Sequence, residues 1–153
     1  MRGSLVLALV LGSSLAARSA HADDCKRSQK HVLGVMKTLD GAASTALTLW
    51  TECMFSGPDQ TRVDKITKVT TRAFSVLKTL RDPEPRCIKS GDFVKAVGTV
   101  GNSVGQRLGL AWATCSPTAQ ARGLQLAAQG KTTEEIEQAM GQMAKDWISG
   151  ITK

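Results

Sequence analysis

Four cysteines, Cys25, Cys53, Cys87 and Cys115, are the residues of this sequence with the best-defined chemistry. The first two are 28 positions apart, and so are the last two. Structural zinc sites use cysteines two to four residues apart, and attachment of a c-type haem uses Cys-x-x-Cys-His; the sequence contains neither pattern. An even number of widely spaced cysteines in an exported chain indicates two disulfides.

The amino terminus predicts export. Arg2 supplies a positive start, the apolar run LVLALVLGSSLAA follows, and AHA at positions 20–22 is a cleavage site of small residues. These are the parts of a secretory signal peptide, and the run is too short to span a membrane. We therefore expect residues 1–22 to be removed and residues 23–153 to form one secreted or periplasmic domain without a transmembrane segment.

Other residues that could do chemistry are isolated. His31 is the only histidine after the predicted leader, and its basic neighbours Arg27 and Lys30 favour a solvent-facing position. No acid or nucleophile can be named as its catalytic partner. The segment QGKTTEE resembles the end of a phosphate-binding loop, but Gln125 stands where that motif needs glycine. We predict no enzymatic activity, no metal site and no cofactor.

The chain is mildly basic. Of its 20 Lys and Arg residues, 18 follow the predicted leader, against 13 acidic residues, which leaves a formal net charge of +5. Such a charge permits contact with anionic surfaces. The chain has no tyrosine and few other aromatic residues, so the interleaved basic and aromatic residues that bind single-stranded nucleic acid are missing. We expect no nucleic-acid partner.

Two segments of the sequence match without gaps. Residues 25–54 align with residues 87–116, and both contain a Trp-x-x-Cys sequence near the end. The identical pairs are Cys25 and Cys87, Ser28 and Ser90, Val32 and Val94, Val35 and Val97, Trp50 and Trp112, and Cys53 and Cys115. The match favours two copies of one helical unit, although similar packing demands on two unrelated helices are an alternative.

Apolar residues in both copies recur at steps of three and four, which is helical spacing. In the first copy they are Val32, Met36, Leu39, Ala43, Ala46, Trp50 and Cys53; in the second they are Val97, Val100, Val104, Leu108, Ala111 and Cys115. Asp40-Gly41 is a weak point in the first copy, but the apolar stripe passes through it unbroken. We predict one helix for each copy.

Helix start and stop signals divide the rest of the chain. A helix between the copies is predicted to begin with Ser56 as its cap, and the two prolines of RDPEPR stop it. Ser116-Pro117 predicts the next start, Gly130 a left-handed stop, and Thr132-x-x-Glu135 a capping box. The predicted fold is all-α: an up-down-up-down four-helix bundle whose fourth helix is split near Gly130.

This architecture predicts the disulfides. A straight helix between Cys25 and Cys53 is about 40 Å long, whereas a disulfide needs Cα atoms within about 7 Å. The expected pairs are therefore Cys25–Cys87 and Cys53–Cys115, one at each end of the bundle. If Asp40-Gly41 instead turned the first helix into a hairpin, the pairs would be Cys25–Cys53 and Cys87–Cys115.

Glycines recur along one face of the second copy. They are Gly98, Gly101, Gly105 and Gly109, and they align with Met36, Leu39, Ala43 and Leu47 in the first copy. Each glycine disfavours the helix by about 1 kcal/mol relative to alanine. One interpretation is close approach of a neighbouring helix; another is a groove for an apolar ligand, flanked by Trp50 and Trp112. A third, association through this face within a membrane, is opposed by Arg107.

Basic residues recur on the helix between the copies. They are Arg62, Lys65, Lys68 and Arg72. Such a stripe is usually a solvated face, and its alternative use is docking to an anionic partner such as lipid headgroups, a cell-wall polymer or an acidic protein. The function predicted first is an exported, non-enzymatic binding protein that holds a lipid-like ligand or partner helix along the glycine groove. An interaction module that uses the basic stripe is the alternative.

Overall fold

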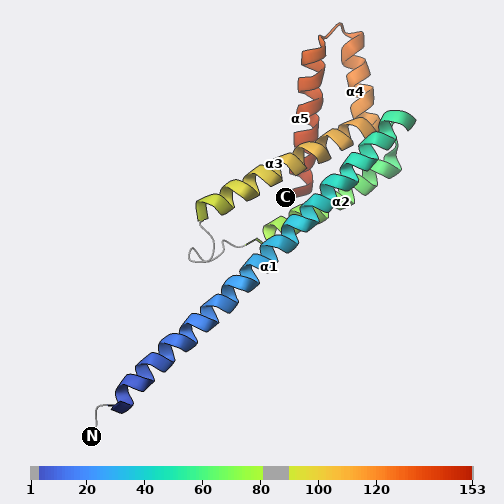
Figure 1. The fold of residues 1–153 in the computed structure, drawn as a ribbon. Helices are drawn as coiled ribbons and strands as arrows, with labels where there is room; N and C mark the ends of the chain where they lie inside the picture. Colours follow the sequence, from blue (N-terminus) through green and yellow to red (C-terminus); the bar gives the residue numbers. More distant parts are fainter. Residues whose placement is uncertain (1–3, 81–89, 153) are drawn as a thin grey trace.

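Five α-helices form the described part of the chain, which comprises residues 4–80 and 90–152 of a computed structural model, with side chains from residue 24 onwards except at 90–94, 96 and 152. They are α1 (Ser4–Ser56), α2 (Gln60–Lys78), α3 (Ser90–Cys115), α4 (Pro117–Ala128) and α5 (Thr133–Thr152) (Figure 1). The described residues contain no strand, which confirms the all-α class.

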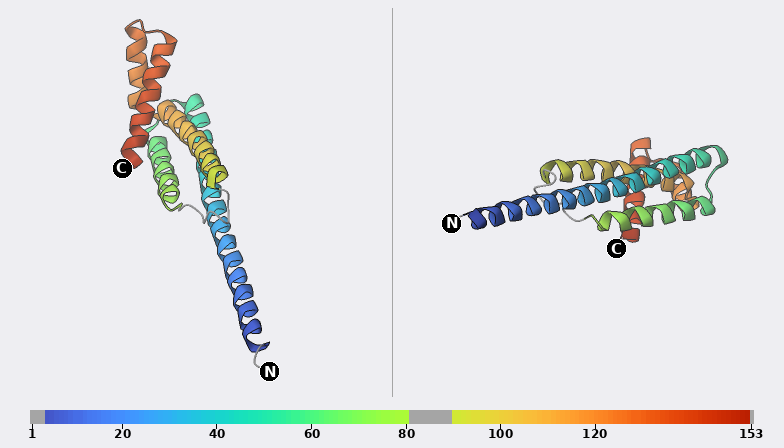
Figure 2. Two further views of the ribbon diagram at one scale, coloured as in Figure 1. Left: turned by 90° about the vertical axis from the view of Figure 1, so that its left-hand side faces the viewer. Right: turned by 60° about the horizontal axis from the view of Figure 1, so that its bottom comes forward.

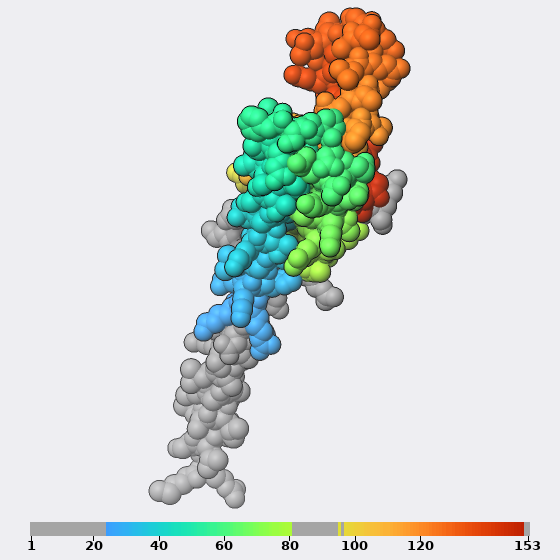
Figure 3. Space-filling view, turned by 90° about the vertical axis from the view of Figure 1, so that its right-hand side faces the viewer, coloured from blue at the N-terminus to red at the C-terminus, as the bar shows by residue number. Residues whose placement is uncertain are grey.

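Three of the helices run side by side. α1 and α3 are parallel, and both end at the same side of the molecule. α2 begins beside these two ends and runs antiparallel to both helices (Figures 1 and 2). α4 and α5 form an antiparallel hairpin that stands at a steep angle to these three helices, and its tip projects beyond them (Figures 1 and 3). α5 returns from the tip to pack against α3 and α2.

The predicted up-down-up-down bundle is therefore not what the chain forms. The predicted fourth rod consists of two helices that fold back on each other. The backbone explains the difference: Ser116, in extended conformation, redirects the chain after α3, and Gly130 (φ 75°) reverses it after α4. A left-handed glycine ends a helix and lets the chain turn sharply, so it gave a hairpin where the sequence predicted a split rod.

The first copy of the repeat lies on one uninterrupted helix. α1 continues through Asp40 and Gly41 without a break, as predicted. A disulfide joins Cys53 at the end of α1 to Cys115 at the end of α3, with their Cα atoms 5.2 Å apart. This confirms one predicted pair and excludes the alternative pairing, Cys25–Cys53 with Cys87–Cys115. Cys25 carries no free thiol; the other predicted pair, Cys25–Cys87, includes Cys87, which lies outside the described residues.

Helix caps set the ends of the elements. Ser116 accepts a hydrogen bond from the Ala119 N–H (3.2 Å), as predicted for the start of α4. The capping box of α5 is also present: the Glu135 N–H donates to Thr132 Oγ1 (3.3 Å), and the Thr132 N–H donates to Glu135 Oε2 (2.9 Å).

The predicted start of α2 was wrong. Ser56 is the last residue of α1, and the cap of α2 is Asp59, whose carboxylate accepts from the Thr61 N–H (2.9 Å). The Asp59 N–H in turn donates to the Cys115 carbonyl (2.9 Å). This bond ties the start of α2 to the end of α3, beside the disulfide.

The core lies where α1, α2 and α3 meet. α1 and α3 bury equivalent positions of the two copies, which are Ala42 and Val104, Ala46 and Leu108, Leu49 and Ala111, and Cys53 and Cys115. α2 adds the buried side chains Val63, Ile66, Thr70 and Ala73. The Thr70 hydroxyl donates to the Ile66 carbonyl (2.7 Å), so this buried polar group is paired.

Candidate functional site

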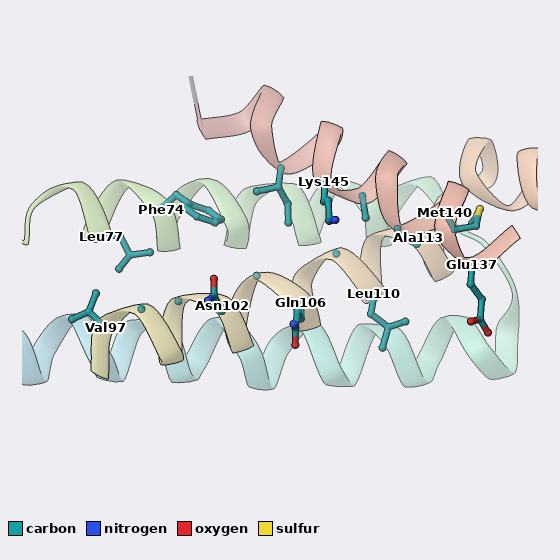
Figure 4. Close-up of a pocket in the computed structure, with 17 residues that line it drawn as sticks. Phe74, Leu77, Val97, Asn102, Gln106, Leu110, Ala113, Glu137, Met140 and Lys145 are labelled. Carbon is teal, nitrogen blue, oxygen red and sulfur yellow. The ribbon is translucent and has the colours of Figure 1, made fainter. Parts of the chain in front are cut away.

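A groove of about 920 Å³ lies along α3, and all four predicted glycines line it (Figure 4). Its other walls come from α2 and α5. The lining residues are Phe74 and Leu77 of α2; Val97, Gly98, Gly101, Asn102, Gly105, Gln106, Gly109, Leu110 and Ala113 of α3; and Glu137, Met140, Gly141, Ala144, Lys145 and Ile148 of α5. Its volume is within the range of pockets that take small molecules.

The space beside the glycines distinguishes close packing of a neighbouring helix from an open groove. A Cβ built on Gly98, Gly101 or Gly105 would have no heavy atom of the described residues within 4 Å, outside its own stretch of helix. A Cβ on Gly109 would lie 3.3 Å from Ala144 Cβ. Close helix packing therefore explains only the last glycine. The other three border open space.

α5 forms the wall opposite α3. Ala144 is buried where α5 crosses Gly109, and Ile148 lies beside it. Met140 lies over the α4 helix, where a Cβ on Gly123 would be 3.6 Å from its Sδ. The sequence predicted the start of α5 from its capping box but did not place the helix at the groove, because local signals do not show which helix it faces.

The two tryptophans predicted to flank the groove are not part of its lining. Trp112 stacks on Trp147 of α5, with ring centroids 5.3 Å apart and an angle of 13° between the ring planes. Trp50 is partly buried against the core. The Trp112–Trp147 stack holds α5 against α3, so Trp112 positions a wall of the groove without lining it.

Polar and charged groups are few in the groove. Among the described residues that line it, Lys145 is the one basic residue and Glu137 the one acidic residue, and Asn102 and Gln106 add two amides at the exposed edge. Within the described part of the chain, Lys145 makes no ion pair. In Figure 4, Lys145 extends over the middle of the groove, while Glu137 lies at the end nearest α4.

The predicted basic stripe on α2 is one residue shorter than expected. Arg62 donates to Glu52 Oε2 (3.0 Å) and also pairs with Asp59 Oδ2 (3.4 Å), and only 22% of its side chain is exposed. It therefore fastens α2 to α1. Lys65, Lys68 and Arg72 are exposed.

Basic residues also lie along α1 beside this stripe. Two shallow hollows, of about 440 and 410 Å³, follow the seam between α1 and α2. Of the described side chains that line them, four are cationic, namely Arg27, Lys30, Lys37 and Arg72, and none is acidic. We call this surface the basic seam; the sequence did not reveal it because its charges come from two helices.

Potential metal ligands do not cluster in the described part of the chain. No group of three or more His, Cys, Asp or Glu there could hold a metal ion. His31 lies at one of the seam hollows, with its Nε2 atom 3.2 Å from the Thr79 carbonyl oxygen. None of the described helices combines the length and apolar character needed to cross a membrane.

Comparison with known proteins adds no family. No protein-family model, curated protein or solved structure matches this chain significantly. The function must therefore be argued from the groove and the basic seam.

Proposed function

We propose that this chain is a non-enzymatic binding protein that holds an apolar or amphipathic small molecule in the groove between α3 and α5. The observation that carries the proposal is the open space beside Gly98, Gly101 and Gly105. Glycine in a helix interior is unfavourable by about 1 kcal/mol relative to alanine, and no neighbouring helix fills the space gained at these three positions. A ligand that occupies this space would explain why glycine is present at these three positions.

The shape and composition of the groove support this function. Its walls are formed by aliphatic, aromatic and methionine side chains together with glycine backbone, and its few polar groups lie at defined points. This is the usual construction of a small-molecule site. The predicted export of the chain fits a carrier, since a ligand with a long apolar part needs protection from water outside a membrane.

The test is mass spectrometry of the protein purified from its native host, intact under native conditions and again after solvent extraction. We expect a stoichiometric small molecule in the first measurement and none in the second. Replacing Gly105 by leucine places a side chain in the groove and should remove the bound mass.

Gly41→Leu is the matched control. Gly41 is also a helical glycine with open space in front of it, but it lies at the basic seam. This variant should keep the ligand. A native protein without bound mass, which also fails to take up any apolar compound added to it, would overturn the proposal, and so would a Gly105→Leu variant that binds as well as the Gly41→Leu variant.

A second candidate function rests on the basic seam. We infer that it would serve an interaction module that contacts an anionic partner through Lys30, Lys37 and Arg72. Replacing these three residues by glutamine should weaken that contact and its dependence on salt, while uptake in the groove stays unchanged. If Gly105→Leu abolishes uptake in the groove and the seam variant changes no binding, only the first function remains.

A further inference from the structure

The two charges of the groove divide it into unlike halves. Lys145 and Ala144 are neighbours on α5, and Ala144 faces Gly109, so Lys145 lies near the middle of the groove. Glu137 precedes Lys145 by eight residues, about 12 Å along a helix. Figure 4 shows Glu137 and Met140 towards one end, and Phe74, Leu77 and Val97 towards the other.

The half beyond Lys145 suits an apolar chain. From Gly109 to Val97 the groove follows twelve residues of α3, about 18 Å. Three open glycines form its floor, and Phe74, Leu77 and Ile148 form its walls. Asn102 and Gln106 are the polar side chains among the described residues that line this half, and both are exposed at the edge.

The charge at the start of this half lacks a partner. Arg27, Arg62 and Lys131 each pair with a carboxylate, whereas Lys145 pairs with none among the described residues. An ammonium group at the edge of an apolar groove attracts an anion and gives it charge-assisted hydrogen bonds. Glu137 repels an anion from the other half and so favours one orientation.

We propose that the ligand is an anionic amphiphile with one apolar chain, whose head contacts Lys145 and whose chain lies along Gly105, Gly101 and Gly98 towards Phe74 and Leu77. This inference rests on the proposed function and specifies the ligand class of the same groove. The head is an anionic group that accepts hydrogen bonds, either a carboxylate or a phosphate.

Four probes with the same chain test the proposal on the full exported protein after ligand extraction. They are dodecanoate, dodecyl phosphate, dodecanol and dodecyltrimethylammonium, titrated below their aggregation concentrations and followed by calorimetry. We expect the two anions to bind more tightly than dodecanol, and dodecanol more tightly than the cation. The tighter of the two anions identifies the head group.

Lys145→Gln gives the decisive comparison. It should weaken binding of the preferred anion by about fivefold, the scale of one exposed charge pair, and leave dodecanol unchanged. Lys65→Gln removes an exposed charge that is outside the groove and should change neither.

The outcomes separate the two proposals. Equal binding of dodecanol and the anions, unaffected by Lys145→Gln, would overturn the inference and leave the groove as a site for neutral apolar ligands. Tightest binding of the cation would overturn it in favour of Glu137 as the head contact. Binding of none of the probes, together with a native protein without bound mass, would overturn the proposed function itself.

Discussion

α1 and α3 are related by an offset of 62 residues, and they pack against each other through equivalent positions. Ala46 and Leu108 are an example, since both are buried at the same place in their copies. The adjacent stripe differs. In α1 it contains Leu39 and Ala43, which are buried in the core, and in α3 the aligned residues are Gly101 and Gly105, which line the groove. One face of the unit holds the two copies together, while the next face is filled in one copy and hollow in the other.

This difference separates the packing of α1 against α3, which uses one face of each helix, from the groove, which lies on the next face of α3. The residues that hold α1 and α3 together occupy aligned positions in the two helices, so both helices contribute to this packing. The groove positions of α3 are glycines, and α2 and α5 approach that face without filling it. The following predictions test this separation, beginning with the largest expected effect.

Removing the covalent link between the copies tests the shared face. The double variant Cys53→Ala, Cys115→Ala opens a loop with a sequence separation of 62 residues. Loop-closure entropy predicts that the free energy of unfolding falls by about 4 kcal/mol. Urea denaturation measures the change, and the unmodified protein without reductant is the control. A loss below about 1 kcal/mol would mean that packing alone fixes the two helix ends together.

Truncating the filled stripe of α1 should also be costly. Leu39 is fully buried, so Leu39→Ala should lower the free energy of unfolding by about 2–5 kcal/mol. Leu47→Ala is the control, because Leu47 is on the aligned stripe but 51% exposed, and its loss should be within about 0.5 kcal/mol. Equal losses would contradict the placement of this stripe in the core.

Filling the hollow stripe of α3 should have the opposite sign. Gly101→Ala and Gly105→Ala add a methyl group that meets no described neighbour, and each should stabilise the protein by about 0.5–1 kcal/mol through helix propensity. Gly109→Ala should lack this gain, because its Cβ would lie 3.3 Å from Ala144 Cβ. Thermal unfolding of the three variants distinguishes them. A destabilised Gly101→Ala variant would show that the groove is closed in solution.

A small pH effect is expected at the start of α5, which forms the groove wall. A hydrogen bond from Lys131 and a second from the Thr132 N–H lower the pKa of Glu135. A carboxyl with a lowered folded-state pKa contributes stability above its ordinary pKa and loses it as the pH falls through the lowered value. An NMR titration of Glu135 should show the lowered pKa, and Lys131→Gln should raise it. An unchanged midpoint in that variant would assign the shift to the capping box alone.

Much of this arrangement could be predicted from local sequence. The continuous α1, the Ser116 cap, the left-handed Gly130 and the Thr132–Glu135 capping box depend on residues close together in the chain, and the structure confirms each of them. The Cys53–Cys115 pair followed from helix length and equal spacing. The start of α2 was misplaced because both Ser56 and Asp59 can cap a helix. Asp59 is the residue that caps α2, and its N–H also bonds to the end of α3, which local sequence does not show.

The features that the sequence did not predict depend on the direction of the chain between helices. A glycine stop indicates where α4 ends but not that α5 folds back along it, so the hairpin was missed and α5 was not assigned to the groove. The same limit explains Trp112, which was predicted to flank the groove but stacks on Trp147 of α5. Arg62 was placed on a free basic stripe because its partner Glu52 belongs to another helix.

The position of the disulfide has a further consequence for how the molecule opens. The bond closes a ring of chain that contains α2 and α3, while α4 and α5 lie outside it. Native-state hydrogen exchange should therefore show two cooperative units, with the amides of α5 exchanging through a smaller opening than those of α3. One side of the groove would then belong to the slow unit and the other to the fast one, and the timescale of hairpin detachment would set how quickly a bound molecule enters and leaves.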